Sequence, residues 1–301
     1  MIGFINLYKE KGVTSFSNIN RLSKILGGCK VGHTGTLDPI AEGVLPVCLN
    51  EATKLASYLI AEDKEYLAGA VLGFKTDSYD TTGSLVAEGD GRIPSEEEIQ
   101  KIINNLVGEV ELEIPAFSAV NIKGKRAYEL ARKGLIENAG MRKSIIYDIK
   151  LVEYSYPNLT ISLKVEKGTY VRSIINKIGE MLGTFGTMNK LLRVRSGFFH
   201  VDTALTVEEI GLMYRNRNYD FLIPVNRVLN WSRVIVKDQF VDMVRNGISI
   251  KRVNYKYIPD NLTEMVFVTD SKGVVLSIAE RSEGEIPFKN IRVFKNENFK
   301  I

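Results

Sequence analysis

The chain of 301 residues is 45% hydrophobic and 25% charged, which is typical of a globular protein. The sequence has no run of the roughly 18 apolar residues that span a membrane and no secretory signal at its start. It has only two cysteines, Cys29 and Cys48, too few for a disulfide framework. We therefore expect a cytoplasmic protein with no membrane partner, and the length allows one large domain and one small domain.

The net charge of +4 is unevenly distributed along the chain. Residues 1–226 contain 27 basic and 27 acidic side chains, so the 13 basic and 9 acidic side chains of residues 227–301 supply the whole excess. Residues 121–143 hold a cluster of basic side chains, which can neutralise nucleic-acid phosphates; a solvated helix face is the equally strong alternative. The cluster consists of Lys123, Lys125, Arg126, Arg132, Lys133, Arg142 and Lys143.

Apolar spacing predicts strands and short helices in the first part of the chain. Residues 4–8 form an apolar run typical of a strand, and Thr14 precedes apolar positions at helical spacing, which predicts a capped helix. A short helix is predicted over 52–59, where apolar residues recur at i, i+3, i+4 and i+7. Residues 64–74 are predicted to form a core strand that carries Tyr66 near its start.

Two capping boxes, beginning at Ser95 and at Thr206, each predict the start of a helix. Between them, apolar periodicity predicts a short helix over 126–134, strands over 145–151 and 159–165, a helix over 174–182 and a strand over 191–199.

The pattern changes near residues 224–230, which we expect to be a linker. Beyond it, short apolar runs separated by turn residues predict a small β-rich domain of about 70 residues. Its predicted strands cover 234–236, 265–268, 274–278 and 291–294.

The most specific loop of the sequence is residues 31–39, which ends in Asp38 and Pro39. Gly32 and Gly35 permit positive φ angles and close backbone approach, and the proline disfavours a helical conformation for the aspartate. A carboxylate presented on such a loop indicates a functional site. The alternative is an aspartate that only caps a turn.

Several common chemistries lack the residues that they need. The two histidines, His33 and His200, are not accompanied by a Gly-x-Ser-x-Gly nucleophile motif. Cys29, His33 and Cys48 are the only candidate metal cluster, and Cys48 lies in an apolar run. The glycines before Thr34 lack the lysine of a phosphate loop. The sequence therefore predicts a reaction that needs no metal, cofactor or nucleoside triphosphate.

Residues 32–54, Gly-His-Thr-Gly-Thr-Leu-Asp-Pro-Ile-Ala-Glu-Gly-Val-Leu-Pro-Val-Cys-Leu-Asn-Glu-Ala-Thr-Lys, closely resemble the signature of the TruB family of tRNA pseudouridine synthases. The resemblance covers residues 3–230 and includes Lys167-Gly-Thr-Tyr-Val-Arg172. It implies an α+β fold whose pseudouridine-synthase catalytic domain, residues 1–228, has a mixed or antiparallel central sheet flanked by helices. Residues 229–301 resemble the family's small PUA-like RNA-binding domain more loosely.

The resemblance also implies the reaction. It predicts isomerisation of the T-arm loop uridine of tRNA, position 55 by convention, to pseudouridine by a monomer that flips the target base. Such an isomerisation breaks an N–C bond and forms a C–C bond with no redox change, which agrees with the missing cofactor motifs.

The family motifs carry over to named side chains. Asp38, Tyr66 and Arg172 are implied to be catalytic, with Arg172 pairing with the aspartate. His33, Tyr170 and Leu191 are implied to contact the flipped nucleotide, and residues 121–143 correspond to an RNA-gripping thumb segment. The implied RNA-binding residues are Lys9, Lys123, Lys125 and Arg126.

Each assignment has a structural alternative. Tyr66 can be strand core, Tyr170 can serve packing, His33 can be a hydrogen-bonded loop residue, and Arg172 can be a surface arginine at a helix start. For Arg172 that alternative is weakened, because the dipole at a helix start disfavours a cation.

The sequence departs from the family pattern at Glu10, Ala116 and Asn121, where proline, proline and lysine are usual. These departures affect the expected RNA grip and leave the reaction class unchanged. The main alternative function is an RNA-binding chaperone or scaffold for tRNA folding that keeps the fold, which has no need of Asp38, Tyr66 and Arg172 together. A nucleotide hydrolase is disfavoured by the missing lysine.

Overall fold

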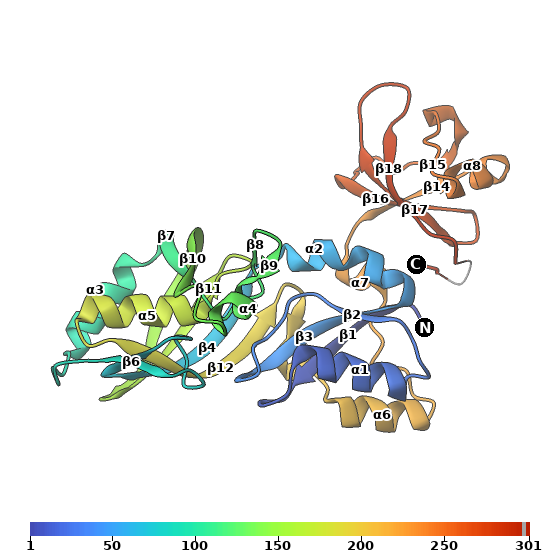
Figure 1. Ribbon diagram of the computed structural model, residues 1–301. Helices are drawn as coiled ribbons and strands as arrows, with labels where there is room; N and C mark the ends of the chain where they lie inside the picture. The colour runs from blue at the N-terminus through green and yellow to red at the C-terminus, as the bar shows by residue number, and fades with distance from the viewer. Residues whose placement is uncertain (297–298) are drawn as a thin grey trace.

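The computed structural model describes residues 1–296 and 299–301, and the strands of the larger of its two main sheets lie within residues 3–200 (Figure 1). Among the described residues this sheet has nine strands. Its main path, in spatial order, is β1 (Gly3–Lys9), β3 (Ala41–Leu49), β12 (Gly186–Ser196), β4 (Lys64–Leu72), β11 (Asn158–Val165), β10 (Asn138–Ser155) and β7 (Gly108–Pro115). β2 (Val31–His33) pairs with β3, and β13 (Phe199–His200) pairs with β12.

The sheet is antiparallel except at one place, where β12 runs parallel to β3. At this pair the two backbones come unusually close at Gly43. Its φ is +100°, and a Cβ added there would lie 2.4 Å from the carbonyl oxygen of Arg193. A side chain cannot be accommodated at that distance, so glycine is required where the halves of the sheet join.

The longer helices lie in two pairs. α3 (Glu96–Asn105) and α5 (Val171–Leu182) lie side by side and pack on the half of the sheet formed by β12, β4, β11 and β10 (Figure 1). α1 (Ser15–Ile25) and α6 (Val207–Arg215) pack against β1 and β3. The shorter helices are α2 (Ala56–Ile60), α4 (Ala127–Ala131), α7 (Val225–Val228) and α8 (Val241–Arg245), with 3₁₀ turns at Asn50–Leu55, Val201–Thr203, Asp238–Phe240 and Arg252–Asn254.

The last part of the chain forms a second sheet of five strands among the described residues. Its spatial order is β15 (Tyr255–Tyr257), β14 (Ser232–Val236), β16 (Met265–Thr269), β17 (Val275–Arg281) and β18 (Phe288–Val293). Two short ribbons complete the strands: β5 (Phe74–Thr76) with β6 (Leu85–Glu88), and β8 (Asn121–Ile122) with β9 (Lys125–Arg126).

The second sheet shares a hydrophobic core with the first. One buried cluster contains Phe4 and Leu55 from the beginning of the chain together with Phe267 and Phe294 from its end. Trp231, the only tryptophan, stacks edge-on against Tyr58 at 4.7 Å between ring centroids. This apolar contact fixes the second sheet beside α2. None of the helices formed by residues 1–296 and 299–301 is long and apolar enough to cross a membrane.

The structure confirms the α+β architecture and the capped helices. Ser95 and Thr206 accept hydrogen bonds from the backbone N–H groups of Glu98 and Glu209, and the Thr14 side chain caps α1. These elements were predictable because caps are short-range features of the sequence.

Other sequence predictions need correction. The expected linker at 224–230 contains α7, and Val225 and Leu229 are buried in the shared core. The expected strand 191–199 begins at Gly186 and ends at Ser196. Of the two glycines before Asp38, only Gly35 has a positive φ, +137°, whereas Gly32 lies in β2.

Candidate active site

A cleft of about 800 Å³ lies between the two halves of the larger sheet. Its walls come from four parts of the chain: residues 34–40, the turn 77–84, the segment 117–119, and the start of α5. Tyr66 on β4 and Leu191 on β12 also line it. The cleft therefore gathers segments that are far apart in the sequence, and most of the predicted motifs meet there.

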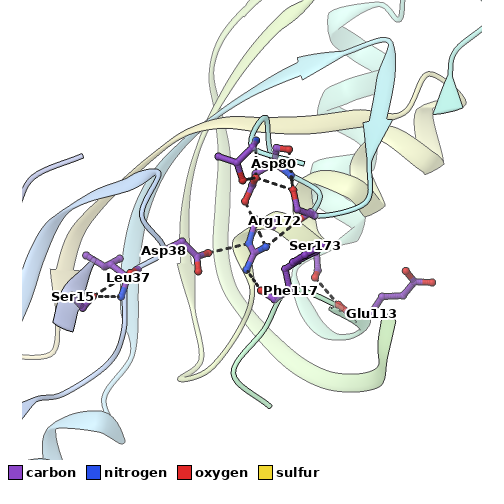
Figure 2. Close-up of polar contacts among 10 residues, drawn as sticks. Ser15, Leu37, Asp38, Asp80, Glu113, Phe117, Arg172 and Ser173 are labelled. Carbon is purple, nitrogen blue, oxygen red and sulfur yellow. Dashed lines mark hydrogen bonds and ion pairs between the residues drawn. The ribbon is translucent and has the colours of Figure 1, made fainter. Parts of the chain in front are cut away.

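Asp38 lies on the loop of residues 34–40, here called the Asp38 loop, between β2 and β3. The side chain of Asp38 is 36% exposed, and its carboxylate accepts no hydrogen bond from the described residues. Its one ion-pair partner among them is Arg172, whose Nε lies 3.0 Å from Oδ2 (Figure 2). The carboxylate is thus paired with a cation on one side and open to the cleft on the other.

Arg172 is the central side chain of the site. It occupies the first turn of α5, and its side chain is only 4% exposed. While Nε faces Asp38, Nη1 donates to the carbonyl oxygen of Ser78 at 2.9 Å and Nη2 to that of Phe117 at 3.3 Å (Figure 2). A planar guanidinium with donors in a fixed fork suits these divergent partners. Because Arg172 is held by three segments, it fixes the Asp38 carboxylate relative to all of them.

Asp80 is a second carboxylate beside Arg172, and its environment differs from that of Asp38. Its Oδ2 lies 3.5 Å from Arg172 Nη1 and its side chain is 5% exposed. Its Oδ1 accepts hydrogen bonds from Ser78 Oγ at 2.9 Å and from the backbone and hydroxyl of Thr82. A carboxylate so enclosed balances the charge of Arg172, whereas Asp38 is the one that can meet a substrate.

The turn that carries Asp80 is strained and anchored. Tyr79, between the two residues that contact Arg172, is a buried non-glycine residue with a φ of +63°, which costs on the order of 1 kcal/mol. Its phenol hydroxyl donates to the carboxylate of Glu113, and its carbonyl oxygen accepts a hydrogen bond from the Met188 N–H at 3.0 Å. Burial and, less strongly, Glu113 raise the pKa of Tyr79 far above its ordinary value, so the phenol stays protonated and keeps donating.

A family model and several relatives of known name match this chain. A family model described as TruB family pseudouridylate synthase (N terminal domain) matches residues 23–171. The tRNA pseudouridine synthase B of Clostridium tetani is 39% identical over 253 residues, covering 83% of this chain and 86% of the relative. That of Clostridium kluyveri is 36% identical over 297 residues, covering 98% and 100%. The chain belongs to the TruB family of pseudouridylate synthases.

The TruB-family assignment extends to the three-dimensional fold. A chain in the crystal structure of a Cbf5-Nop10-Gar1 complex aligns with 99% of this chain and 86% of its own length. The TM-score is 0.70 and the sequence identity 26%. The similarity covers both sheets, so the arrangement of the second sheet is shared as well as that of the first.

The residues that the TruB motifs single out fall into two groups in space. Asp38, Tyr66, Tyr170, Arg172 and Leu191 all line the cleft. Tyr66 is half-buried, with its ring packed on the core under α5, and Tyr170 immediately precedes the first residue of α5. The structure therefore brings together the predicted catalytic trio and two of the predicted nucleotide contacts.

His33 and Lys9 lie outside the lining of the cleft. His33 is half-buried in β2, where burial and then the charge of Arg193 lower its pKa, so its imidazole is neutral near pH 7. Lys9 is fully buried and donates to the carbonyl oxygen of Ala41 at 2.6 Å. Burial lowers the pKa of Lys9 to about 8, while the charge of Asp38 opposes this effect. Enclosed in this way, Lys9 supports the Asp38 loop and is not accessible to RNA, contrary to its predicted RNA contact.

The side chains that the predicted thumb segment contributes to the cleft are not the three basic residues predicted to bind RNA. Lys123, Lys125 and Arg126 are exposed on the β8–β9 hairpin and do not line the cleft. Arg132 and Arg142 do line it, and Arg142 donates to the carbonyl oxygen of Lys167 at 3.0 Å. The hairpin thus lies outside the lining of the cleft, while the two arginines face the cleft itself.

Asp80, Ser78 and Phe117 are the site residues that sequence reasoning missed. A signal did exist for Asp80, since residues 77–82 are rich in carboxylates and hydroxyls and directly follow the strand that starts near Tyr66. Ser78 and Phe117 contribute only carbonyl oxygens to Arg172, which every residue type can supply, so no sequence signal could reveal them. Among residues 1–296 and 299–301, no group of three His, Cys, Asp or Glu side chains is arranged to hold a metal ion.

Proposed function

We propose that this chain is a tRNA pseudouridine synthase that isomerises the uridine of the T-arm loop, position 55, with Asp38 at the catalytic centre. The observation that carries the proposal is the pairing of an accessible carboxylate, Asp38, with a buried cation, Arg172, in a cleft that also contains Tyr66. The names of the curated relatives support tRNA as the substrate.

The chemistry of the isomerisation suits this set of residues. The N1–C1′ bond of uridine breaks and a C5–C1′ bond forms; C5 loses a proton and N1 gains one, so the atoms balance with no external reagent. Asp38, paired with Arg172, supplies the nucleophile or base, and Tyr66 can accept or deliver a proton beside it. The uracil must leave the base stack to reach Asp38, and the cleft gives it a pocket.

The experiment that tests the proposal uses an unmodified tRNA transcript. We expect incubation with the protein to place pseudouridine at position 55, detected by chemical labelling and primer extension. A transcript with cytidine at that position is the control and should acquire no label. Failure to modify the first transcript would contradict the proposal and favour a chaperone that only binds RNA.

Tyr66→Phe separates the ring of this residue from its hydroxyl. No hydrogen bond from the described residues occupies the phenol oxygen, so the substitution should fold normally and keep the stacking surface. We expect the rate of turnover of bound RNA to fall by about 10²-fold or more, as for loss of a proton-transfer group, while tRNA affinity is unchanged. The measurements are single-turnover rate and equilibrium binding. If tRNA affinity falls while the single-turnover rate of bound RNA is unchanged, Tyr66 only lines the pocket and takes no part in proton transfer.

The β8–β9 hairpin is expected to grip the RNA backbone and to close over the bound T-arm. Lys123 at its tip and the exposed Lys125 and Arg126 can contact phosphates, and each duplex contact adds about 0.9 to the slope of log affinity against log salt. Replacing all three with alanine should reduce that slope by about two to three contacts and weaken all tRNAs similarly. The measurement is binding at several salt concentrations.

A charge-matched variant controls for the change in net charge. Lys24, Lys101 and Arg215 are exposed on α1, α3 and α6, away from the cleft lining, and their replacement by alanine removes the same three charges. We expect this variant to keep the wild-type salt slope. Equal slopes for both variants would show that the hairpin makes no phosphate contacts and that the RNA grip lies elsewhere, with the basic C-terminal sheet as the next region to test.

The proposal includes the organisation of the chain. We assign residues 1–228 to the catalytic domain and residues 229–301 to a small PUA-like RNA-binding domain, acting as a cytoplasmic monomer. The excess of basic over acidic side chains in residues 227–301 supports an RNA-binding role for the second sheet.

A further inference from the structure

We infer that Ser15 is a positioning residue for the reaction, because its buried hydroxyl holds both main-chain polar groups of Leu37 and so fixes the backbone of Asp38. The inference rests on the proposed function, since it concerns the residue that places the proposed nucleophile. No other side chain of the described residues bonds to the backbone of Leu37 in this way.

The hydroxyl of Ser15 makes a reciprocal pair of hydrogen bonds. Ser15 Oγ donates to the carbonyl oxygen of Leu37 at 3.1 Å and accepts from the Leu37 N–H at 3.0 Å (Figure 2). Ser15 is 2% exposed and Leu37 is 3% exposed, so both bonds are shielded from solvent. The side chain of Leu37 is itself part of the core under α5. The N–H group, the carbonyl oxygen and the side chain of Leu37 are therefore all held in place, and Asp38 is the next residue in the chain.

Ser15 is in turn attached to a rigid element. It is the first residue of α1, whose preceding residue Thr14 caps the helix by accepting from the Ser17 N–H at 3.1 Å. The helix is anchored by Ile19 and Leu22, which are buried in the core against β1 and β3. A catalytic loop tied to a packed helix is positioned more precisely than one held only by its own turns.

The other side of Asp38 is held in the same manner, through the main chain. The carbonyl oxygen of Asp38 accepts from the Ala41 N–H at 3.0 Å, and that of Pro39 accepts from the Gly12 N–H at 2.8 Å. Lys9 binds the carbonyl oxygen of Ala41. By contrast, the Asp38 carboxylate has a single ion pair among residues 1–296 and 299–301, that with Arg172.

This division of roles has a chemical consequence. A carboxylate that attacks or deprotonates a substrate must keep its lone pairs available, so it cannot be oriented by several hydrogen bonds of its own. Holding the backbone on both sides gives the required precision without occupying those lone pairs. The precision of Asp38 therefore depends on Ser15, although Ser15 is not among the residues that line the cleft.

The test compares Ser15→Ala with Ser23→Ala. Ser23 lies on the same helix and also loses one side-chain bond to the backbone, that to the carbonyl oxygen of Cys29 at 2.7 Å, but it is away from the cleft. We expect Ser15→Ala to lower the single-turnover rate by about 10- to 100-fold, as for a misplaced catalytic group, with tRNA affinity unchanged. Ser23→Ala should keep both values. A wild-type rate for Ser15→Ala, or equal losses in both variants, would overturn the inference.

Amide hydrogen exchange of the wild-type protein gives a second test, which does not depend on how the variants fold. The Leu37 amide should exchange its hydrogen with solvent more slowly than the amides of Thr36 and Asp38, because Ser15 shields it. Equally fast exchange at the three positions would also overturn the inference. If wild-type protein makes no pseudouridine at all, the proposed function fails instead, so the two failures are distinguishable.

Discussion

Asp38→Asn is expected to abolish pseudouridine formation while leaving tRNA binding nearly intact. The amide has the shape of the carboxylate but is neither a nucleophile nor a base, and loss of such a group costs on the order of 10³-fold or more in turnover. The Asp38 side chain makes only one ion pair with the described residues and lies on a loop held through its backbone, so the substitution should not disturb the fold. The measurements are pseudouridine formed in a single turnover and the dissociation constant for the same tRNA.

The second carboxylate supplies the control for this experiment. Asp80→Asn changes the charge beside Arg172 by the same amount, but Asp80 is enclosed and bonded through Oδ1 to Ser78 and Thr82. We expect it to reduce turnover, through a displaced Arg172, without abolishing it. If Asp38→Asn retained substantial turnover while Asp80→Asn had none, the roles of the two carboxylates would have to be exchanged.

The parts of the fold that the sequence predicts are those determined by near neighbours in the chain. The caps at Thr14, Ser95 and Thr206 act within one helical turn. The Asp38 loop is likewise predictable from neighbouring residues, because Gly35, Asp38 and Pro39 lie within five positions and belong to the family signature. Such features do not depend on how the rest of the chain folds.

The parts that could not be predicted depend on tertiary structure. β3 contains Gly43 and Pro46, which normally disfavour a strand, yet it lies between β1 and β12. The tertiary context overrides this preference because Gly43 permits the close approach of Arg193.

The same limit applies to the side chains around the site. Ser15 and Leu37 are 22 residues apart, and Arg172 and Ser78 are 94 apart. Lys9 shows that a matched motif does not reveal what its side chain contacts. The family resemblance implies a contact between Lys9 and RNA, whereas its ammonium group is buried on the carbonyl oxygen of Ala41. Sequence patterns therefore identify the residues of this site more reliably than they identify the atoms that each residue contacts.

Arg172→Lys is expected to impair turnover severely, even though the positive charge is kept. The guanidinium faces Asp38 with Nε and donates through Nη1 and Nη2 to carbonyl oxygens of two other segments. A lysine ammonium is a compact point charge, and it cannot reach these partners in their present directions at once. We expect the single-turnover rate to fall by about 10²-fold, comparable to a displacement of the catalytic group by 1 Å, with little change in tRNA affinity.

Lysine is a sharper test than alanine at this position. Arg172→Ala would leave the buried carboxylate of Asp80 without its cation, and breaking a buried pair in this way costs about 3–5 kcal/mol of stability. A loss of activity could then reflect unfolding. With lysine the charge remains, so thermal unfolding should stay close to that of the wild type while turnover falls. Near-normal turnover by Arg172→Lys would show that charge alone suffices, and that the fork between Asp38, Ser78 and Phe117 does not set the position of the nucleophile.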